Sequence, residues 1–493
     1  MAAVLCSETL TARQECLRSR APLWLAAIAV FIRSIGLFRS DLGFALLPDD
    51  SFEYLELARG MLHGCGFARL LDGACESPEI LRTPGYPLLL TTLPDTRWII
   101  AAQALLAGVT CWLVATWVRR RWSPAAAVLA EAVVAFDLPS IVMANAVMPE
   151  TLFQLAVVLA VVPGLMLATR PRHDFALALT TGIAGACAIL VRPIAILFPL
   201  IGPIPYLAIP SLNWRRRLAL ASLAASIPAL ALVGWAWRNY QRAGFAGLST
   251  VGAINLYYYR AADVAARERG ARLEAMRAPF GRRLGVSYEH IYEADVQSAA
   301  LTERMERLAM EQLMRRPLGA LAMTAQSSVY LALTAVRSPL ARLLGIEGWS
   351  AGNGLNAGAP SLTRFAAVVR KLWRSPLLAV LVVAQLLITL AVWVGVGRAL
   401  SRCLNADREY RLWTLYLTGT AILLLVLAAG GEASARFRVP AIPLLGIVAA
   451  LGYLPGGGFH ARAEAMKRGG RLAIATRSPR WKPFATSASS ADC

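Results

Sequence analysis

The sequence predicts an all-α, polytopic membrane protein with about 11 to 12 transmembrane helices, whose extracytoplasmic loops carry short amphipathic helices. Of the 493 residues, 57% are hydrophobic and only 16% are charged, and the mean hydropathy is +0.53. A soluble globular domain carries about 25% charged residues. The apolar residues form repeated runs of about 17 to 25 residues, long enough to cross a hydrocarbon core of roughly 30 Å. A soluble globular domain is therefore excluded.

The formal net charge of +20 would suggest a nucleic-acid partner in a soluble chain. Here the arginines lie in short loops between apolar runs, at 119–121, 170–172 and 215–217. This pattern sets membrane topology and attracts anionic lipid. We therefore expect membrane lipids as partners and no nucleic acid.

The N-terminal segment 1–21 is polar and basic, and the first apolar run (22–38) has no small-residue cleavage site after it. This favours an uncleaved signal anchor with a cytoplasmic N-terminus. The segment that follows, including Asp49 and Asp50, is then expected on the opposite side. We interpret 22–455 as the transmembrane domain and the basic segment 456–493 as a cytoplasmic, partly disordered tail.

Two long polar segments are expected on the outer side, 39–97 and 238–316. The further spans are expected at 98–118, 124–143, 149–168, 175–191, 193–210, 218–237, 317–336, 376–397, 412–429 and 439–454. Together with the first run, these spans would place the C-terminal tail outside. A basic tail is instead expected in the cytoplasm. One segment must be missed, re-entrant or interfacial, and the region 317–375 is the main suspect.

The larger polar segment has helix-like composition between residues 261 and 314, which is typical of a solvated helical loop. Beside a membrane site, such a loop could also serve as a lid or an acceptor-binding element. In the smaller segment, Cys65 and Cys75 could form a disulfide if that side is oxidising. Cys111 and Cys187 lie in apolar runs and are interpreted as packing residues.

Acidic residues provide the first site hypothesis. In a helix, Asp50 and Tyr54 would share one face, and a partly desolvated Asp50 could act as a general base. Equally, Asp49 or Asp50 could cap the N-terminus of the helix that follows. Glu150 begins an outer span, where a carboxylate also interacts favourably with a helix N-terminus. Paired carboxylates could instead bind a divalent cation, although no metal ligand is assigned.

Arginines at the outer edges of apolar runs provide the second hypothesis. Guanidinium groups bind phosphate through a planar fork of donors, although single interfacial arginines more often extend toward lipid headgroups. The predicted substrate- and phosphate-binding residues are Arg82, Tyr54, Tyr86, Arg192, Arg238, Asn239, Arg436 and Arg438.

The order of short motifs resembles membrane glycosyltransferases of the C superfamily. The motifs are D-x-x-x-Y-x-x-x-A, G-x-G, R-T-P-G-Y-P, P-E-x-L-F, R-P, W-R-N-Y, G-x-x-N-L-Y and R-F-R-V-P-x-x-P, spread over residues 48–443. The chain is most similar to glycosyltransferase family 39, which includes dolichyl-phosphate-mannose protein mannosyltransferases and the aminoarabinose transferase of lipid A.

This resemblance implies transfer of a sugar from a polyprenyl-phosphate donor to a lipid, glycan or protein acceptor on the outer face of the membrane. It implies an essential acidic residue at Asp50, a second at Glu150, and phosphate contacts at Arg82, Arg192 and Arg436. The family often has Asp-Glu at the first place, whereas this chain has Asp49, Asp50 and Ser51, so the choice between the two aspartates stays open.

The expected mechanism is a single inverting displacement in which Asp50 removes the acceptor proton, with Asp49 and Glu150 shaping the site. The expected compartment is a bacterial cytoplasmic membrane, with the active site facing outward. A multi-span transporter, an oligosaccharide polymerase or ligase, and a non-catalytic scaffold remain as alternatives. A transporter would need acidic residues near mid-membrane, where Glu131 is the example, and repeated halves, which the sequence does not show.

Overall fold

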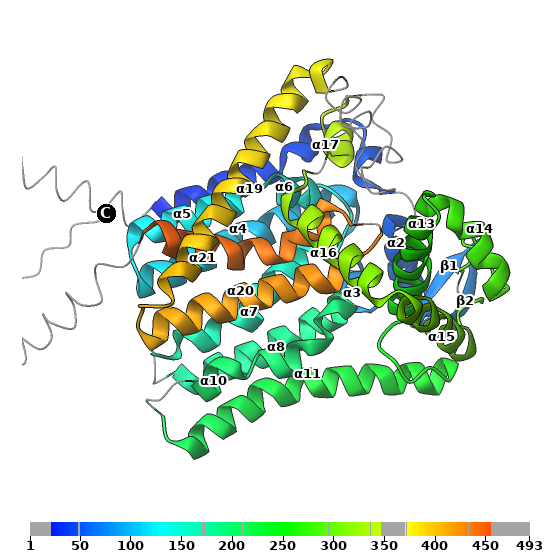
Figure 1. The fold of residues 1–493 in the computed structure, drawn as a ribbon, viewed down its shortest axis with the longest axis horizontal. Coiled ribbons are helices and arrows are strands. Elements are labelled where there is room, and N and C mark those ends of the chain that lie inside the picture. Colours follow the sequence, from blue (N-terminus) through cyan, green and yellow to red (C-terminus); the bar gives the residue numbers. More distant parts are fainter. Residues whose placement is uncertain are drawn as a thin grey trace, which may run out of the picture.

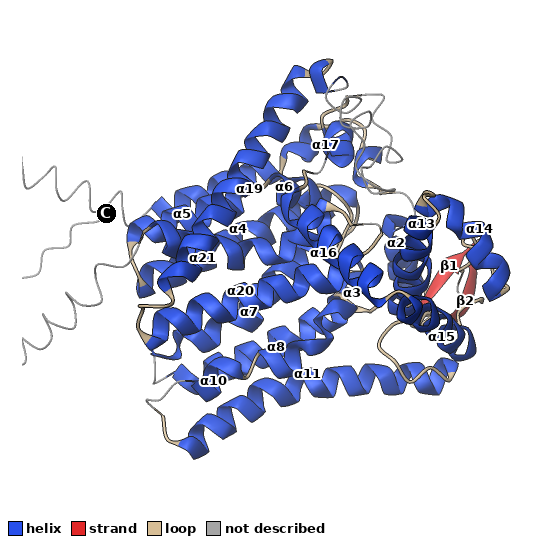
Figure 2. Cartoon of the chain, in the orientation of Figure 1, coloured by secondary structure: helices blue, strands red, loops and turns tan. Residues whose placement is uncertain are grey.

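The protein is an all-α, polytopic membrane protein in a computed structural model, with most helices running along the long axis of a bundle (Figures 1 and 2). The structure describes residues 21–47, 50–168, 173–208, 212–293, 295–335, 337–346, 370, 372–431 and 433–454. Asp49, almost all of the predicted N-terminal segment and the predicted tail lie outside this part of the chain.

Seven described helices are long and apolar enough to cross a membrane, or eight if one bent pair forms a single span. Three shorter apolar helices account for further predicted spans. The long helices are α4 (Thr96–Arg121), α8 (Asp174–Val191), α11 (Trp214–Ala243), Pro317–Leu343, α19 (Pro376–Arg402), α20 (Arg408–Ala428) and Ala435–Tyr453. The shorter ones are Ala21–Arg33, α7 (Glu150–Leu165) and Pro193–Ala208.

Prolines and polar residues explain why several predicted spans are shorter or broken. Between Pro193 and Ala208 the chain forms three short helices, because proline removes backbone donors and interrupts a continuous helix. They are η5 (Pro193–Leu197), α9 (Phe198–Ile201) and α10 (Ile204–Ala208). Three further short helices are η1 (Ile35–Phe38), η2 (Gly43–Ala45) and η3 (Met166–Ala168).

The predicted span 124–143 is bent by 54° between α5 (Pro124–Phe136) and α6 (Leu138–Ala144). Asp137 lies at the break and caps α6 by accepting a hydrogen bond from the backbone N–H of Ser140. The buried guanidinium of Arg33 donates to the carbonyls of Val134 and Ala135 at the end of α5. Both ends of the break are therefore satisfied by side chains.

At the centre of the bundle lies α21 (Ile442–Tyr453), preceded by the 3₁₀-helix η8 (Ala435–Ala441). Almost every residue of α21 is buried, and it packs on α5, α19 and α20. A helix that is apolar all round fits this central position. By contrast, α19 exposes large apolar side chains along its length, as expected for a surface that faces lipid.

One end of the bundle carries the elements of the first predicted outer segment (Figure 1). They are α2 (Asp50–Leu62), the antiparallel strands β1 (Ala68–Leu71) and β2 (Ala74–Pro78), and α3 (Gly85–Leu90). A disulfide joins Cys65 to Cys75 across this hairpin, the pairing that the sequence left open. Gly60 lets α2 approach β1, because any Cβ there would overlap the carbonyl oxygen of Ala68. We call this the α2 end.

The second predicted outer segment folds over the α2 end. It contains α12 (Val251–Ile254), the π-helix η6 (Asn255–Ala261), α13 (Ala262–Glu268), α14 (Leu273–Leu284) and α15 (Ala299–Arg315). Its own apolar core includes Tyr257, Phe280 and Met305. The segment is thus a packed layer and not a loosely solvated loop. Arg69 fixes it to the hairpin by donating to the carbonyl of Tyr292 over 3.0 Å.

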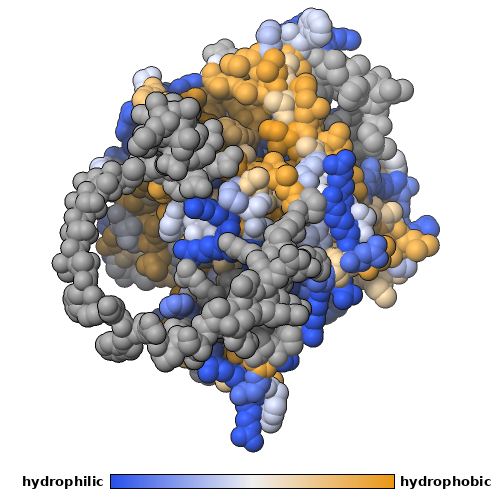
Figure 3. Space-filling view, turned by 90° about the vertical axis from the view of Figure 1, so that its left-hand side faces the viewer, coloured by the Kyte–Doolittle hydropathy of each residue, from blue (hydrophilic) through white to orange (hydrophobic). Residues whose placement is uncertain are grey.

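The opposite end of the bundle is basic. The first described helix begins there and α21 ends there (Figure 1), close to the start of α8 and the arginine-rich start of α11. Arg216 donates to buried Asp174 at this end. Figure 3 looks onto this face, where hydrophilic side chains surround the centre and hydrophobic ones cover the upper flank.

The region 317–375, whose topology the sequence left open, contains α16 (Pro317–Leu333) and α17 (Arg337–Leu343). Helix α16 starts beside α15, and α17 packs on η2, α6 and the start of α19. Arg39, just after η1, donates to the carbonyl of Leu343 over 3.3 Å. Helix α16 therefore runs from beside α15 into the bundle, and α17 lies against η2 and α6.

Candidate functional site

A cavity of about 1550 Å³ lies between the α2 end of the bundle and the layer formed by residues 238–316. Its floor includes the charged side chains of Asp50, Glu53 and Arg82, together with Arg192 and Arg436. These residues come from α2, the turn before α3, the end of α8 and η8. The opposite wall includes Asn255, Tyr259, Arg277, Tyr288 and Tyr292. Segments far apart in sequence thus contribute charged side chains to one cavity.

Asp50 lies at the centre of the charged floor, in the first turn of α2. Its Oδ1 accepts a hydrogen bond from Nη2 of Arg82 and its Oδ2 accepts one from Nη1 of Arg436, both over 2.6 Å. Both carboxylate oxygens therefore contact arginine. Charge-assisted bonds of this length are among the strongest hydrogen bonds that side chains make.

Burial alone would raise the pKa of the Asp50 carboxyl, because a desolvated charge is unfavourable. The charges and hydrogen bonds of Arg436 and Arg82 outweigh burial and hold the pKa well below its ordinary value of 3.8. In this arrangement Asp50 is ionised but is a weak proton acceptor. Its basicity must therefore rise when an arginine is drawn to another anion.

Glu53 extends the charge network on the same face of α2. Its Oε2 accepts a hydrogen bond from Nε of Arg82 over 2.6 Å, and Oε1 lies 3.9 Å from Nη2 of Arg69. Burial raises the pKa of Glu53 above its ordinary value, although Arg82 and Arg69 oppose the rise. Arg69 in turn donates to Glu79 over 2.9 Å. Carboxylates and guanidinium groups therefore alternate along the floor.

The turn before α3 holds Arg82 in place. The Glu79 carboxylate accepts hydrogen bonds from the backbone N–H groups of Leu81 and Arg82. The Arg82 guanidinium carbon lies 5.1 Å from the ring centroid of Tyr54, within cation–π distance. Tyr54 packs edge-on against Tyr86 with ring centroids 5.2 Å apart. The motif R-T-P-G-Y-P thus fixes the direction of one arginine.

A second ion pair, between Glu150 and Arg192, lies beside the Asp50 cluster. Arg192 has extended backbone between α8 and η5, and its Nη1 donates to Oε1 of Glu150 over 2.7 Å. The Glu150 side chain is fully buried, and its Oε2 has no hydrogen-bond partner among the described residues. The guanidinium carbons of Arg192 and Arg436 lie 5.4 Å and 4.8 Å from the ring of Phe437. Phe437 therefore links the two clusters.

Five of the predicted site residues that the structure describes do not line the cavity: Glu150, which pairs with Arg192, and Tyr86, Arg238, Asn239 and Arg438. Tyr86 donates to Gln103, and Arg238 donates to the carbonyls of Phe67 and Glu79, which secures the hairpin. Asn239 donates to the carbonyls of Gly247 and Leu248. Arg438 is directed into the bundle, as described below. These side chains hold the cavity walls, and their predicted contact with substrate has no support from their positions.

Glu53 and Phe437 line the floor but were not predicted as site residues. Glu53 could have been recognised from its spacing, because a residue three positions after Asp50 shares its helix face. Phe437 carries a weaker signal, because an aromatic residue at a membrane interface does not by itself indicate a binding site. Its role depends on the 3₁₀ geometry of η8, which the sequence does not reveal.

A divalent cation fits the described carboxylates poorly. Asp50, Glu53 and Glu150 each contact arginine, so at least one oxygen of each carboxylate already faces positive charge. Among the residues that the structure describes, no group of three or more His, Cys, Asp or Glu side chains is arranged to hold a metal ion. Asp49 lies outside those residues.

Comparison with known proteins gives structural likeness at low sequence identity. The oligosaccharyltransferase of Archaeoglobus fulgidus in the apo form matches with a TM-score of 0.47 and 14% identity, over 93% of this chain and 54% of that one. ArnT from Cupriavidus metallidurans in the apo state matches with a TM-score of 0.34 and 16% identity, over 92% of this chain and 80% of that one.

The present chain spans about half the length of the archaeal oligosaccharyltransferase structures. No protein-family model matches the chain, and no curated protein matches it.

Proposed function

We propose that this chain is a membrane glycosyltransferase that moves a sugar from a polyprenyl-phosphate donor to an acceptor. The observation that carries the proposal is the placement of Asp50 between Arg82 and Arg436 on the floor of a large cavity. Such a transfer needs a carboxylate that accepts a proton and guanidinium groups that bind a phosphate. The motif order described above is consistent with this assignment.

The donor's phosphate is assigned to Arg192 and Arg436. Both line the cavity and lie within cation–π distance of Phe437, so their charged groups are held near one another. The cavity continues past Arg192 along apolar side chains of η5 and α20, including Ile194, Ile196 and Leu424. An isoprenoid chain suits this apolar wall, while a phosphate suits the arginines beside it.

The proposed reaction begins with an exchange of partners. A bound phosphate competes with Asp50 for Arg436, and loss of that contact raises the proton affinity of Asp50. The Asp50 carboxylate then removes the proton from an acceptor hydroxyl or amine. The acceptor atom forms a bond to the anomeric carbon as the bond from that carbon to the phosphate oxygen breaks, with inversion. Polyprenyl phosphate leaves with the electron pair, stabilised by the arginines.

Glu150 is assigned an indirect part in this reaction, as the carboxylate that orients Arg192. Its buried Oε1 anchors the guanidinium, and its position off the cavity argues against contact with the reacting atoms. Asp49 keeps the predicted role of shaping the site.

We further propose that the cavity faces the outside of a bacterial cytoplasmic membrane. The basic end lies opposite the α2 end, and arginine-rich loops favour the cytoplasmic side. The Cys65–Cys75 disulfide lies at the α2 end, as expected in an oxidising compartment. Both features support the same orientation.

The test is a transfer assay with protein reconstituted in liposomes. Polyprenyl-phosphate sugars are compared with polyprenyl-pyrophosphate sugars, using pooled lipid, glycan and peptide acceptors. The released polyprenyl phosphate or polyprenyl pyrophosphate is measured. Release from the monophosphate donors that depends on acceptor supports the proposal. Release from pyrophosphate donors alone would favour a polymerase or ligase. Movement of donor across the bilayer without cleavage would favour a transporter.

A further inference from the structure

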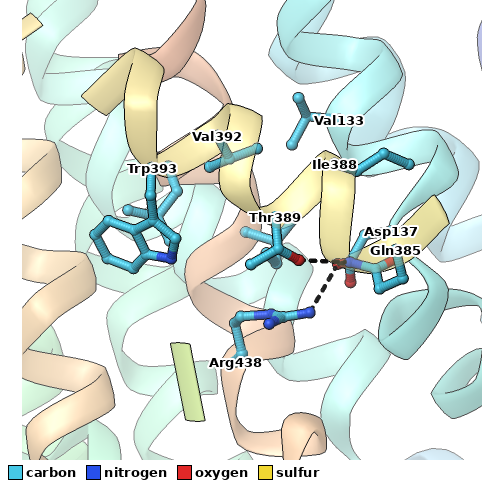
Figure 4. Close-up of a pocket in the computed structure, with 10 residues that line it drawn as sticks. Val133, Asp137, Gln385, Ile388, Thr389, Val392, Trp393 and Arg438 are labelled. Atoms are coloured by element: carbon cyan, nitrogen blue, oxygen red, sulfur yellow. Dashed lines mark hydrogen bonds and ion pairs between the residues drawn. The ribbon is translucent and has the colours of Figure 1, made fainter. Parts of the chain in front are cut away.

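We propose that the buried ion pair between Asp137 and Arg438 is a positioning device that directs Arg436 and Phe437 into the cavity. The inference rests on the proposed function for its catalytic consequence, but its structural part can be tested without any transfer. It assigns Asp137 and Arg438 a role distinct from substrate contact. Figure 4 shows the pair where the α5–α6 break, α19 and η8 meet.

Arg438 is fully buried and is bound on two sides. Its Nη1 donates to the carbonyls of Ala332 and Thr334, over 2.9 and 3.1 Å, at the end of α16. Its Nη2 lies 3.5 Å from Oδ1 of Asp137. The guanidinium therefore ties η8 to two other segments, the end of α16 and the α5–α6 break.

Asp137 is in turn fixed by its own neighbours. Its Oδ2 accepts hydrogen bonds from the backbone and the hydroxyl of Ser140, and its Oδ1 accepts one from Gln385. Gln385 also accepts from the backbone N–H of Leu138 and donates to Thr389. The carboxylate is thus held in one orientation by α6 and α19, and it presents a fixed target to Arg438.

The space beside the pair is too small for a substrate. The cavity lined by Asp137, Gln385, Thr389 and Arg438 has a volume of about 10 Å³, roughly what a single water molecule occupies. A phosphate or a sugar cannot enter it. Arg438 therefore acts on the reaction through the helix that carries it, and the expectation of a direct phosphate contact is replaced by this role.

The geometry of η8 explains how the anchor reaches the active site. In a 3₁₀-helix successive side chains project about 120° apart. When Arg438 is directed into the bundle, Arg436 and Phe437 must project elsewhere, and here they face the cavity. Gln154 provides a second tie by donating to the carbonyl of Val439 over 2.7 Å. Rotation of η8 would therefore separate Arg436 from Asp50.

The test compares Asp137→Asn with Asp174→Asn. Both changes neutralise a buried aspartate that pairs with an arginine, but Asp174 pairs with Arg216 at the basic end. Two readouts are used, hydrogen exchange of the backbone at 435–441 and the affinity for polyprenyl phosphate in detergent. We expect Asp137→Asn to speed exchange at 435–441 and to weaken binding at least 10-fold, and Asp174→Asn to do neither. Equal effects of the two variants, or no effect of Asp137→Asn, would overturn the proposal.

A double variant separates positioning from general stability. Breaking a buried ion pair is costly because a charge is left unpaired, whereas replacing both partners by apolar residues is often tolerated. We expect D137L/R438M to unfold at a temperature closer to wild type than D137N does, while its kcat stays about 10²-fold low, because a small misplacement of Arg436 is enough. If the double variant recovered both its melting temperature and its kcat, the Asp137–Arg438 pair would contribute only to stability, and the positioning role would be wrong.

The outcomes also distinguish this inference from the proposed function. Suppose that wild-type protein neither binds polyprenyl phosphate nor transfers sugar, and that hydrogen exchange at 435–441 is faster in Asp137→Asn but not in Asp174→Asn. The positioning role then stands and the proposed function fails. If wild-type protein binds and transfers, and Asp137→Asn matches it in both readouts, the positioning role fails and the function stands.

Discussion

Oδ2 of Asp50 lies 2.6 Å from Nη1 of Arg436, although the two residues are 386 positions apart in the sequence. The contact joins the segment after the first helix to the segment before the last. Arg82 approaches the other oxygen of the same carboxylate. This relationship makes Asp50 the counter-ion of the arginines and, in the proposed reaction, the anion that competes with the phosphate for Arg436.

The first prediction concerns Arg436. Arg436→Gln should weaken binding of polyprenyl phosphate about 10- to 100-fold, because a hydrogen bond to a charged group contributes about 1.5 to 3 kcal/mol. Arg436→Lys should lose less, since it keeps the charge but not the planar fork. Binding can be measured by calorimetry in detergent. Arg408→Gln at the basic end serves as the control, and equal losses there would contradict a specific role for Arg436.

The second prediction concerns pH and stability. The folded pKa of Asp50 is lowered below the ordinary value of 3.8, so the ion pairs contribute their full stability above that pH and lose it as the pH falls further. The difference in melting temperature between wild type and Asp50→Asn should stay constant from pH 7 to about 4.5 and shrink below 3.8. Thermal unfolding in detergent measures it. A difference that vanishes between pH 7 and 5 would refute the pairing.

The third prediction concerns the Cys65–Cys75 disulfide, which closes a short loop with a sequence separation of 10. Replacing both cysteines by serine should destabilise the protein by about 2 to 4 kcal/mol, because the unfolded chain gains freedom. The loss should appear first in the hairpin that carries Arg69 and Glu79. Hydrogen exchange with and without the bond reports it. Maleimide labelling of either cysteine before reduction, in protein from intact cells, would contradict the bond.

Much of the fold can be predicted from the sequence, because long apolar runs have few alternatives in a membrane. The polar features near Asp50, Arg82, Arg192 and Arg436 could be recognised for the same reason, since charge at a span edge needs a partner. The sequence contains a signal for the break at Asp137, because Pro139 interrupts the apolar run. The side chains that stabilise the break, Arg33 and Gln385, could not be predicted, because they come from distant helices.

The directions of some side chains also could not be predicted from the sequence. The motif R-F-R suggests two equivalent arginines, but a 3₁₀-helix sends Arg436 to the cavity and Arg438 into the bundle. Arg238 and Asn239 were predicted to bind substrate because they belong to one of the motifs. In the structure both donate hydrogen bonds to backbone carbonyls. Local sequence gives the residue type, while the surrounding tertiary structure decides which surface it reaches.

The most direct test of the central claim is sugar transfer by Asp50→Asn in a single turnover, measured beside its affinity for polyprenyl phosphate. A positioned base contributes about 10²- to 10⁴-fold to rate. We therefore predict that transfer slows by about that factor while the lipid phosphate binds at least as tightly as in wild type, because a competitor of the phosphate for Arg436 is neutralised. Transfer within about twofold of wild type would contradict the assignment of Asp50 as the base.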